Sequence, residues 1–384
     1  MDQAVPNQGA LNNISTRLYS LDALRGFDMF WIMGADEIIQ ELSHATHSPF
    51  WNALALQFTH PDWNGFHLYD LIFPLFLFMA GVSTPFSIGR ELEKGKTREQ
   101  LLLRVIKRAL ILVALGVFIN NGIKIEPIAQ IRFASVLGRI GIAYLFANIF
   151  YLYTKEWAQI ALFWFFIVGY YLLLKFTSAP GFHMGDLSPQ GNFASYMDRL
   201  ILPGRLYVPY PGTKISMHDP EGLFSTIPAI STGLLGILTG SFLKKSGLEP
   251  TVKALCLGLL GLVFLLLAWA WSLDFPLNKN LWSSSFVLHV GGLSLILLGL
   301  FYYIIDVLGY KKWAFFFKVI GMNSILIYLS GHIIKWNYTN DSLFGWLGVL
   351  AGKPWGAVIL AITFVLIKWL FLYYLYNKKT FLKV

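Results

Sequence analysis

Charged residues are scarce in this chain, and their scarcity excludes whole classes of protein. Asp, Glu, Lys and Arg make up 13% of the 384 residues, whereas 56% are hydrophobic and the mean hydropathy is +0.57. A soluble protein of this size needs far more polar surface. The composition therefore predicts an integral membrane protein that crosses the bilayer several times.

Cysteine and cofactor-binding motifs are nearly absent as well. The single cysteine, Cys256, lies in an apolar run, which excludes a disulfide within the chain and suggests a small core residue. There is neither a Gly-x-Gly-x-x-Gly pattern nor a P-loop, so a conventional nucleotide-binding fold is excluded. The pairs His44/His47 and His60/His67 have no close third ligand, and no metal site is predicted.

Long hydrophobic stretches are abundant instead. A helix needs about 20 apolar residues to cross the bilayer, and runs such as 255–271 lack the alternation of a membrane β-barrel. Gly34 and Gly81 lie within such stretches, where we expect close helix packing rather than breakage. The sequence predicts an all-α integral membrane protein, a single domain over 1–384. Its transmembrane helices, about ten in number, are expected near 22–42, 67–89, 100–121, 132–153, 157–176, 223–243, 251–272, 282–305, 313–333 and 355–376.

Lysine and arginine gather on alternate connections between these stretches, which predicts the orientation. By the positive-inside rule the cationic side is the cytoplasm, with the tail 1–20 and the C-terminus on it. The first residues lack the basic segment of a cleaved signal peptide, so the first helix is expected to remain. These flanks account for most of the net charge of +9, and no nucleic-acid partner is inferred. The cations are Arg90, Lys94, Lys96, Arg98, Lys244, Lys245, Lys253, Lys311, Lys312, Lys378, Lys379 and Lys383.

The longest loop, residues 177–222, falls on the outer side in this topology. Glycines and prolines punctuate it, yet Phe182, Phe193 and Tyr196 supply apolar material that can fold down onto the bundle. We expect an ordered outer cap between the fifth and sixth helices, and we use the word cap for residues 177–222 below.

Ionisable side chains crowd the segment 59–70, just before the second stretch. It contains His60, Asp62, Asn64, His67 and Asp70. Titratable groups at the mouth of a bilayer usually have a function. His60 is the best candidate for a general base because imidazole titrates nearest to neutral pH. His67 is expected to support the site or to lie at the interface.

The first stretch carries a stripe of charge. At 100° per residue, Asp22, Arg25, Asp28 and Asp36 fall within about 120° of one another, over a rise of about 21 Å. Such a stripe can line a path through the bundle, with Arg25 placed for a phosphate. Alternatively, the first three residues pair at i, i+3 and hold the helix end together. Asp36 has no such neighbour of opposite sign.

Several motifs together resemble the heparan-α-glucosaminide N-acetyltransferase family. They occur in the family's order and span nearly the whole chain. The resemblance implies a membrane enzyme that takes acetyl-CoA from the cytoplasm and delivers the acetyl group to a terminal glucosamine across the membrane. The matching segments are Ser20–Gly26, His60–Gly65, Asp70–Pro74, Arg132–Phe133, Gly138–Gly141, Tyr196–Leu200, Asp219–Gly222, Asn278–Ser283 and Gly321–Ile325.

The chain departs from the animal members in two ways. It lacks their N-terminal lumenal region and the span that follows, which fits a ten-helix member of bacterial type in the inner membrane. Asp36 stands where the animal enzymes carry an asparagine. A carboxylate is charged and only accepts hydrogen bonds, whereas an amide also donates, so this change bears on the acceptor or the mechanism. A homodimer is suggested by the resemblance alone.

The chemistry follows from the residues. An amine acceptor must lose a proton before it attacks a thioester. We expect His60 to take that proton, with Asp36 or Asp70 fixing its tautomer, and the resemblance supports His60. An acetylated His60 intermediate is the alternative.

The remaining site residues are assigned from the resemblance and from position. Asn323 and Ser324 are expected with Arg25 at the coenzyme A site, although interhelical hydrogen bonding is the plainer reading for both. Asp219 and Lys279 either bind sugar or pin the cap to the bundle. Arg132 and Arg139 are expected to pair with a carboxylate such as Asp36 or Asp70, and Arg90, Arg104 and Arg108 to mark topology. The predicted sugar-binding set is Asn64, Asp219, Glu221, Lys279, Asn280 and Trp282.

Two other classes of function remain open. A transporter of a small polar or sugar substrate would use the same intramembrane charges, although transporters often carry two related halves and no internal repeat is visible here. A structural or lipid-flipping scaffold would leave His60 dispensable. Acetyl-CoA binding discriminates among the three.

Overall fold

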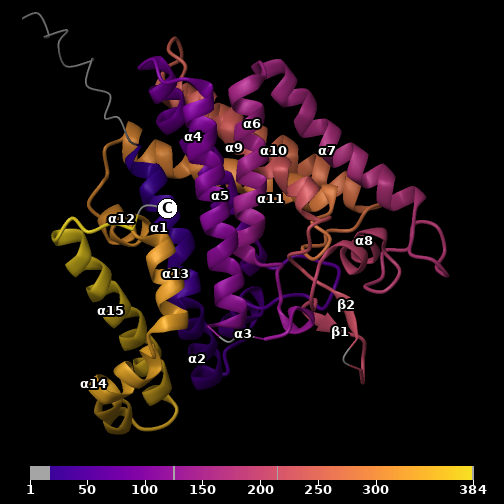
Figure 1. The fold of residues 1–384 in the computed structure, drawn as a ribbon. Coiled ribbons are helices and arrows are strands. Elements are labelled where there is room, and N and C mark those ends of the chain that lie inside the picture. The colour runs from indigo at the N-terminus through magenta and orange to yellow at the C-terminus, as the bar shows by residue number, and fades with distance from the viewer. Residues whose placement is uncertain (1–17, 124–125, 214, 383–384) are drawn as a thin grey trace, which may run out of the picture.

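The chain folds almost entirely into helices, as the composition predicts. We describe residues 18–123, 126–213 and 215–382 of a computed structural model (Figure 1). The strands β1 (Val208–Pro209) and β2 (Ser216–His218) form an antiparallel hairpin inside the cap. The helices are α1 (Tyr19–Phe30), α2 (Asp36–Thr46), α3 (Pro49–Gln57), α4 (Ile72–Glu93), α5 (Arg98–Asn121), α6 (Val136–Tyr153), α7 (Glu156–Phe176), α8 (Phe193–Ile201), α9 (Thr226–Lys244), α10 (Pro250–Ser272), α11 (Ser284–Tyr302), α12 (Ala314–Gly321), α13 (Ser324–Ile333), α14 (Trp336–Ala351) and α15 (Trp355–Asn377).

All ten predicted stretches are largely helical, but fewer of them qualify as membrane spans. Among the described residues, 7 helices are long and apolar enough to cross a membrane, or up to 8 if the bent pair α12–α13, which turns by 65°, is one span. The helix α5 is not among them because cations such as Arg104, Lys107 and Arg108 extend into its apolar part. The first stretch is not among them because it is broken. Ten spans are therefore not confirmed.

The break in the first stretch lies at Gly34. A π-helical turn, Trp31–Ala35, separates α1 from α2, and Gly34 has a φ of 120° inside it. Only glycine adopts this conformation readily, and a Cβ there would stand 2.7 Å from the ring of Phe364. The expectation that Gly34 merely aids packing is thus wrong, and the stripe does not continue at 100° per residue to Asp36.

Glycine does serve close packing elsewhere in the bundle. Gly81 on α4 lies against the backbone of Gly233 and Gly236 on α9, where any side chain would collide with main-chain atoms. Gly26 on α1 meets Gly321 at the end of α12 in the same way. These contacts bring the helices that carry the polar side chains close together.

The bundle has two interior helices, α4 and α9, and a more exposed layer around them. In α4 and α9, 78% of the apolar window is buried, against 28% in α7 and α10. Leucines such as Leu255, Leu262 and Leu266 of α10 stay exposed, which suits contact with lipid chains. The helix α4 begins at Ile72, so the polar segment 59–70 leads directly into an interior helix of the bundle.

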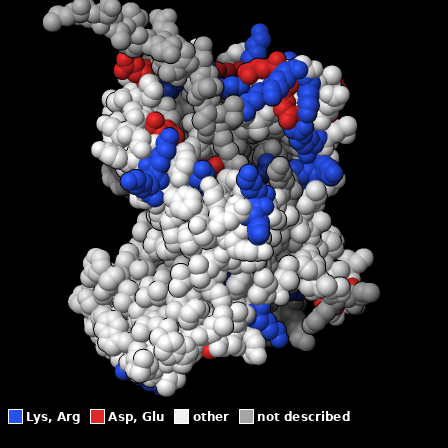
Figure 2. All heavy atoms as spheres, turned by 90° about the vertical axis from the view of Figure 1, so that its left-hand side faces the viewer, with Lys and Arg blue, Asp and Glu red and all other residues white. Residues whose placement is uncertain are grey.

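The charges gather at one end of the molecule. Lysine and arginine concentrate over the upper part of Figure 2, above a broad belt with few charges. The connection between α4 and α5 lies at that end, whereas α2, α3 and the hairpin β1–β2 lie toward the other (Figure 1). This distribution agrees with the predicted side assignment, which stays a prediction because no membrane is present.

The cap is folded. The side chain of Asn192 accepts a hydrogen bond from Ser195 N and starts α8, and Trp63 Nε1 donates to the carbonyl of Leu187 at 2.9 Å. The second contact joins the cap to the segment that contains His60.

Candidate active site

His60 and Asp70 form the centre of the site. His60 Nδ1 lies 2.6 Å from Asp70 Oδ1, with the carboxylate 1% exposed and the imidazole 51% exposed. Asp70 belongs to a 3-10 turn, Leu68–Leu71, and its Oδ2 accepts the backbone N–H of His67 at 3.1 Å. The carboxylate is thus fixed from two sides. With Nδ1 bound to Asp70, Nε2 is the nitrogen that can take a proton.

Lys279 completes a cluster of three charged or titratable groups. Its Nζ lies 3.2 Å from Asp70 Oδ1, and 3.4 and 3.5 Å from Nδ1 and Nε2 of His60. Burial lowers the pKa of Lys279, and the attraction of Asp70 opposes that effect. The lysine was predicted to bind sugar, and the structure places it beside the base.

A cavity of about 620 Å³ opens in front of this cluster. Its walls come from segments far apart in the sequence, including the cap and α13. Of the residues predicted for sugar binding, Glu221, Lys279 and Asn280 line it. Other lining residues with polar groups include Asp62, Trp63, Asn120, Arg132, Tyr207, His218, Tyr328 and His332.

Arg132 and Asp219 hold the cap against the bundle. Arg132 donates to Asp219 from Nε at 2.8 Å and from Nη2 at 2.7 Å, and it also pairs with Glu221. The guanidinium lies over the ring of Tyr207. These carboxylates raise the pKa of Arg132 against the opposing effect of burial. Arg132 was expected to pair with a carboxylate such as Asp36 or Asp70, and it does pair with carboxylates, but they are Asp219 and Glu221.

Arg139 also has other partners than expected. Its Nη2 donates to the carbonyl of Gly222 and to the hydroxyl of Ser225. The guanidinium lies over the ring of Trp282, 4.9 Å from its centroid. Both arginines therefore hold the chain just before α9, and neither bonds the carboxylate beside His60.

Trp282 and Asn64 do not have the positions that sugar contacts require. Trp282 is 0% exposed, with Phe73 and Phe286 against its ring, so it is a core residue. Asn64 accepts a hydrogen bond from Asn278 at 3.0 Å and does not line the cavity. Asp219 is 4% exposed and is occupied by Arg132. These three side chains are structural in the described geometry.

Asp36 is not among the residues that line this cavity. The residue that packs directly against His60 is Tyr69, whose ring lies 5.2 Å from the imidazole. Of the two carboxylates expected to orient His60, Asp70 does so directly.

A second cavity, of about 540 Å³, lies on the side of the molecule where the cations gather. Arg25, Arg90, Arg108 and Ser324 line it. Arg25 bonds Ser83 and lies 3.6 Å from Asp22, so the i, i+3 pairing on α1 is present. Phosphate groups favour such a gathering of guanidinium groups. Arg90 and Arg108 were expected to mark topology, and only the fold shows that both line the same cavity as Arg25.

The side chain of Asn323 is hydrogen-bonded to the C-terminal segment. Its Nδ2 donates to the carbonyl of Thr380, and its Oδ1 accepts the backbone N–H of Leu382, each at 3.0 Å. Its predicted role in coenzyme binding is therefore not supported by a free polar group. Ser324, the next residue, does line the second cavity.

One helix reaches both cavities. Ile325 lines the second cavity and Tyr328, one turn further along α13, lines the first. Phe76 of α4 lines the second cavity and packs in the same apolar clusters as Tyr328. A layer of apolar and aromatic side chains therefore stands between the two cavities.

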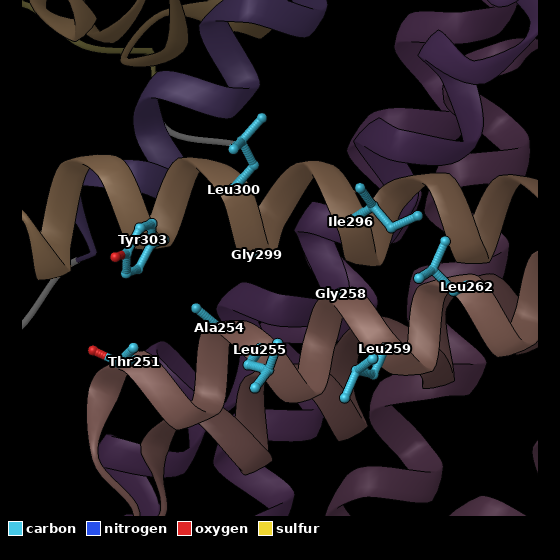
Figure 3. Close-up of a pocket in the computed structure, with 10 residues that line it drawn as sticks. All are labelled: Thr251, Ala254, Leu255, Gly258, Leu259, Leu262, Ile296, Gly299, Leu300 and Tyr303. Carbon is cyan, nitrogen blue, oxygen red and sulfur yellow. The ribbon is translucent and has the colours of Figure 1, made fainter.

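A third hollow lacks the chemistry of a reaction site. Figure 3 shows the groove between α10 and α11, lined by leucine, isoleucine, glycine and alanine with Thr251 and Tyr303 at one end. It carries no carboxylate, imidazole or cation. Within residues 18–123, 126–213 and 215–382, no group of three potential metal ligands was found either.

Known proteins match this chain along most of its length. Residues 17–196 match a family described as a domain of unknown function (DUF5009). The heparan-alpha-glucosaminide N-acetyltransferase of Mus musculus is 28% identical over 375 residues, which cover 84% of this chain and 55% of that protein. The enzyme of the same name from Homo sapiens is 28% identical over 385 residues, or 87% and 55%. The chain is a distant relative of these acetyltransferases and spans about half of their length.

Proposed function

We propose that this chain is a membrane acyltransferase that moves the acetyl group of acetyl-CoA to the amine of a glucosamine-type sugar. The observation that carries the proposal is the His60–Asp70 pair at 2.6 Å, with the imidazole open to a cavity. The relatives at 28% identity are named as N-acetyltransferases of this kind, which supports the reaction class.

The two cavities suit two substrates. Coenzyme A needs cations for its phosphates, and Arg25, Arg90 and Arg108 line the second cavity, on the predicted cytoplasmic side. The sugar would occupy the first cavity, where Glu221 and Asn280 offer a carboxylate and an amide to its hydroxyl groups. The pantetheine arm of coenzyme A would have to carry the thioester past the layer that contains Phe76 and Tyr328, so that the acetyl group is still bound to sulfur when it reaches His60.

His60 handles the proton in this reaction. Its Nε2 takes a proton from the amine as the amine nitrogen bonds the thioester carbonyl, and the C–S bond breaks with the proton passing to the leaving thiolate. Asp70 stabilises the imidazolium that forms in between. The ammonium of Lys279, beside both groups, stabilises the oxyanion of the tetrahedral intermediate. In the covalent alternative, Nε2 attacks the thioester and acetyl-His60 transfers the group in a second step.

Transport of a small polar or sugar substrate is the second candidate. The bent pair α12–α13 favours it, because broken helices are common where transporters bind substrate. A location in a bacterial inner membrane, cytoplasmic termini, an outer position of His60 and a homodimer also remain predictions of the sequence.

Purified protein incubated with radiolabelled acetyl-CoA and glucosamine-terminated oligosaccharides tests the proposal. We expect label in the sugar with the wild type and its near-complete loss in His60→Ala. His44→Ala is the matched control, since His44 is exposed on α2. Normal turnover in folded His60→Ala would sink the assignment, and uptake of sugar without acetylation would favour transport.

A further inference from the structure

The segment Thr380–Leu382 follows α15 and turns back toward the break between α12 and α13. The turn contains Lys379, which has a left-handed φ of 53°. The segment then pairs with Asn323, which is 2% exposed and lies where the two helices meet at 65°. The Asn323 amide donates to the carbonyl of Thr380 and accepts the N–H of Leu382, each at 3.0 Å. One side chain therefore holds both ends of this segment, which we call the C-terminal strap.

The strap forms part of the wall between two cavities. Phe381 and Met322 line both the second cavity, where the arginines gather, and a smaller cavity of about 330 Å³ beside α12 (Figure 1). The other residues that line the smaller cavity are Lys318, Tyr376, Asn377 and Lys379. Cations therefore stand on both sides of the strap, and we call the smaller space the lysine cavity.

The two lysines of this cavity have no anionic partner within the protein as described. Over residues 18–123, 126–213 and 215–382, no ion pair joins Lys318 or Lys379 to a carboxylate. Nζ of Lys318 lies 4.2 Å from the centroid of the Tyr19 ring, and Lys379 is exposed. The amide of Asn377 adds a further donor group. Phosphate oxygens only accept hydrogen bonds, so two ammonium groups and an amide suit a phosphate.

Coenzyme A carries phosphate in two places on one nucleoside. The 5′-diphosphate leads to the pantetheine arm, and the 3′-phosphate projects from the same ribose in another direction. Because the arm must point toward His60, the diphosphate belongs with Arg25, Arg90 and Arg108 in the second cavity. A 3′-phosphate then needs a separate group of cations close by. The lysine cavity provides one, since it shares Phe381 and Met322 with the second cavity.

We propose that the lysine cavity binds the 3′-phosphate of coenzyme A, and that the strap packs against the adenosine between the two phosphate sites. The ring of Phe381 offers a surface on which adenine can stack. Asn323 is a positioning residue, because it acts on the ligand only through the strap. This site deepens the proposed function and rests on it for the identity of the ligand.

Binding of coenzyme A and of 3′-dephospho-coenzyme A to the purified chain tests the site, because the two ligands differ only in the 3′-phosphate. Titration calorimetry in zwitterionic detergent gives both Kd values. We expect dephospho-coenzyme A to bind roughly tenfold or more weakly than coenzyme A. Lys318→Met and Lys379→Met should each lower this ratio about threefold, and the double variant should bring it within about twofold of unity. Their Kd for dephospho-coenzyme A should stay within about twofold of the wild type.

Lys378→Met is the matched control for charge. Lys378 directly precedes Lys379 and is also exposed, but it lines neither cavity, and its Nζ lies 5.9 Å from the centroid of the Tyr374 ring. The ratio should be unchanged in this variant.

Two further variants test the strap. Phe381→Ala should weaken both ligands about equally, by roughly tenfold, because both contain adenine. Asn323→Ala should weaken binding and also lower the ratio, since release of the strap frees Lys379. A change confined to thermal stability would assign Asn323 a structural role alone and overturn the strap. If Asn323→Ala does not fold, Phe381→Ala decides for the strap and the lysine variants for the cavity.

The outcomes separate this site from the proposed function. A wild-type ratio in the double lysine variant, an equal fall in Lys378→Met or no binding of either ligand overturns the site. Thermal stabilisation by phosphatidylglycerol that only the double variant loses, with its ratio unchanged, would assign the lysines to lipid and overturn it as well. A chain that discriminates the ligands but transfers no acetyl group keeps the site and loses the function. A chain that transfers acetyl groups without discrimination loses only the site.

Discussion

Arg132 donates two parallel hydrogen bonds to Asp219, at 2.8 and 2.7 Å, although the two residues lie 87 positions apart in the sequence. Asp219 follows β2 at the end of the cap, and Arg132 precedes α6. The same guanidinium touches Glu221 and the ring of Tyr207, both of which line the first cavity. One arginine therefore holds the cap in place and shapes the wall of the proposed sugar site.

Arg132→Gln should loosen the cap. It leaves the carboxylate of Asp219 buried without a cation, and breaking a buried pair in this way destabilises a protein by roughly 3–5 kcal/mol. We expect a lower thermal midpoint and faster proteolysis within the exposed turn at 210–213. Arg205→Gln is the control, since Arg205 is exposed and its side chain donates from Nε to the carbonyl of Gln130. Equal stability of the two variants would contradict the role of the pair.

Asp70→Asn should nearly abolish acetyl transfer while the fold persists. The amide keeps the shape but loses the charge that stabilises the imidazolium, so we expect kcat to fall by about 10² or more. Steady-state kinetics with acetyl-CoA and an amino sugar measure it. Asp274→Asn, at an exposed pair with Lys175, should retain wild-type activity. A kcat within about threefold of wild type in Asp70→Asn would remove Asp70 from the reaction centre.

Arg108→Gln should weaken acetyl-CoA binding. Arg108 lines the second cavity, its Nε is buried without a hydrogen-bond partner, and its guanidinium lies over the ring of Tyr144. Loss of a charge-assisted contact to a phosphate should raise KM for acetyl-CoA by roughly tenfold or more, with KM for the sugar unchanged. Arg104→Gln, at an exposed pair with Glu91, is the matched control. A rise in the sugar KM alone would reverse the assignment of the cavities.

Asp198 should make stability depend on pH. Burial raises the pKa of Asp198 to about 7, so the folded protein keeps a proton there that the unfolded chain has lost. Stability contributed by the protonated form is therefore complete near pH 4 and falls as the pH rises toward 7. Asp198→Asn retains an acceptor for the N–H of Phe224 and should flatten this decline. Thermal unfolding between pH 4 and 8 tests it, and an unchanged slope in the variant would exclude Asp198 as its source.

Residues close in sequence could be interpreted without the fold. The class of protein followed from apolar content, and the polar segment 59–70 from its position before an apolar stretch. His60 and Asp70 stand ten positions apart, and the short segment between them leaves few ways for the two side chains to avoid each other. Relatedness to the acetyltransferases, expected from motifs along the chain, is confirmed by the comparisons.

Contacts between residues that lie far apart in the sequence could not be predicted in the same way. Lys279 reaches His60 from the connection before α11, and Arg132 selects Asp219 rather than Asp36 or Asp70. Trp282 was predicted to contact the sugar because the sequence does not show that its ring is buried. Arg90 and Arg108 looked like flanking charges, since nothing in the sequence states that they share a cavity with Arg25.

The sequence by itself determined that much of this protein avoids water, and it determined which ionisable side chains are available for a site. Long apolar runs are excluded from water. Ionisable side chains within or beside such runs usually have a function, which singles out His60, Asp70 and Arg25. Tertiary structure alone decided which of those charges meet. A hydrogen bond or ion pair depends on distances of a few ångströms, and only the packing of segments far apart in the sequence sets them, as it does for Arg132 with Asp219 and for Lys279 with Asp70.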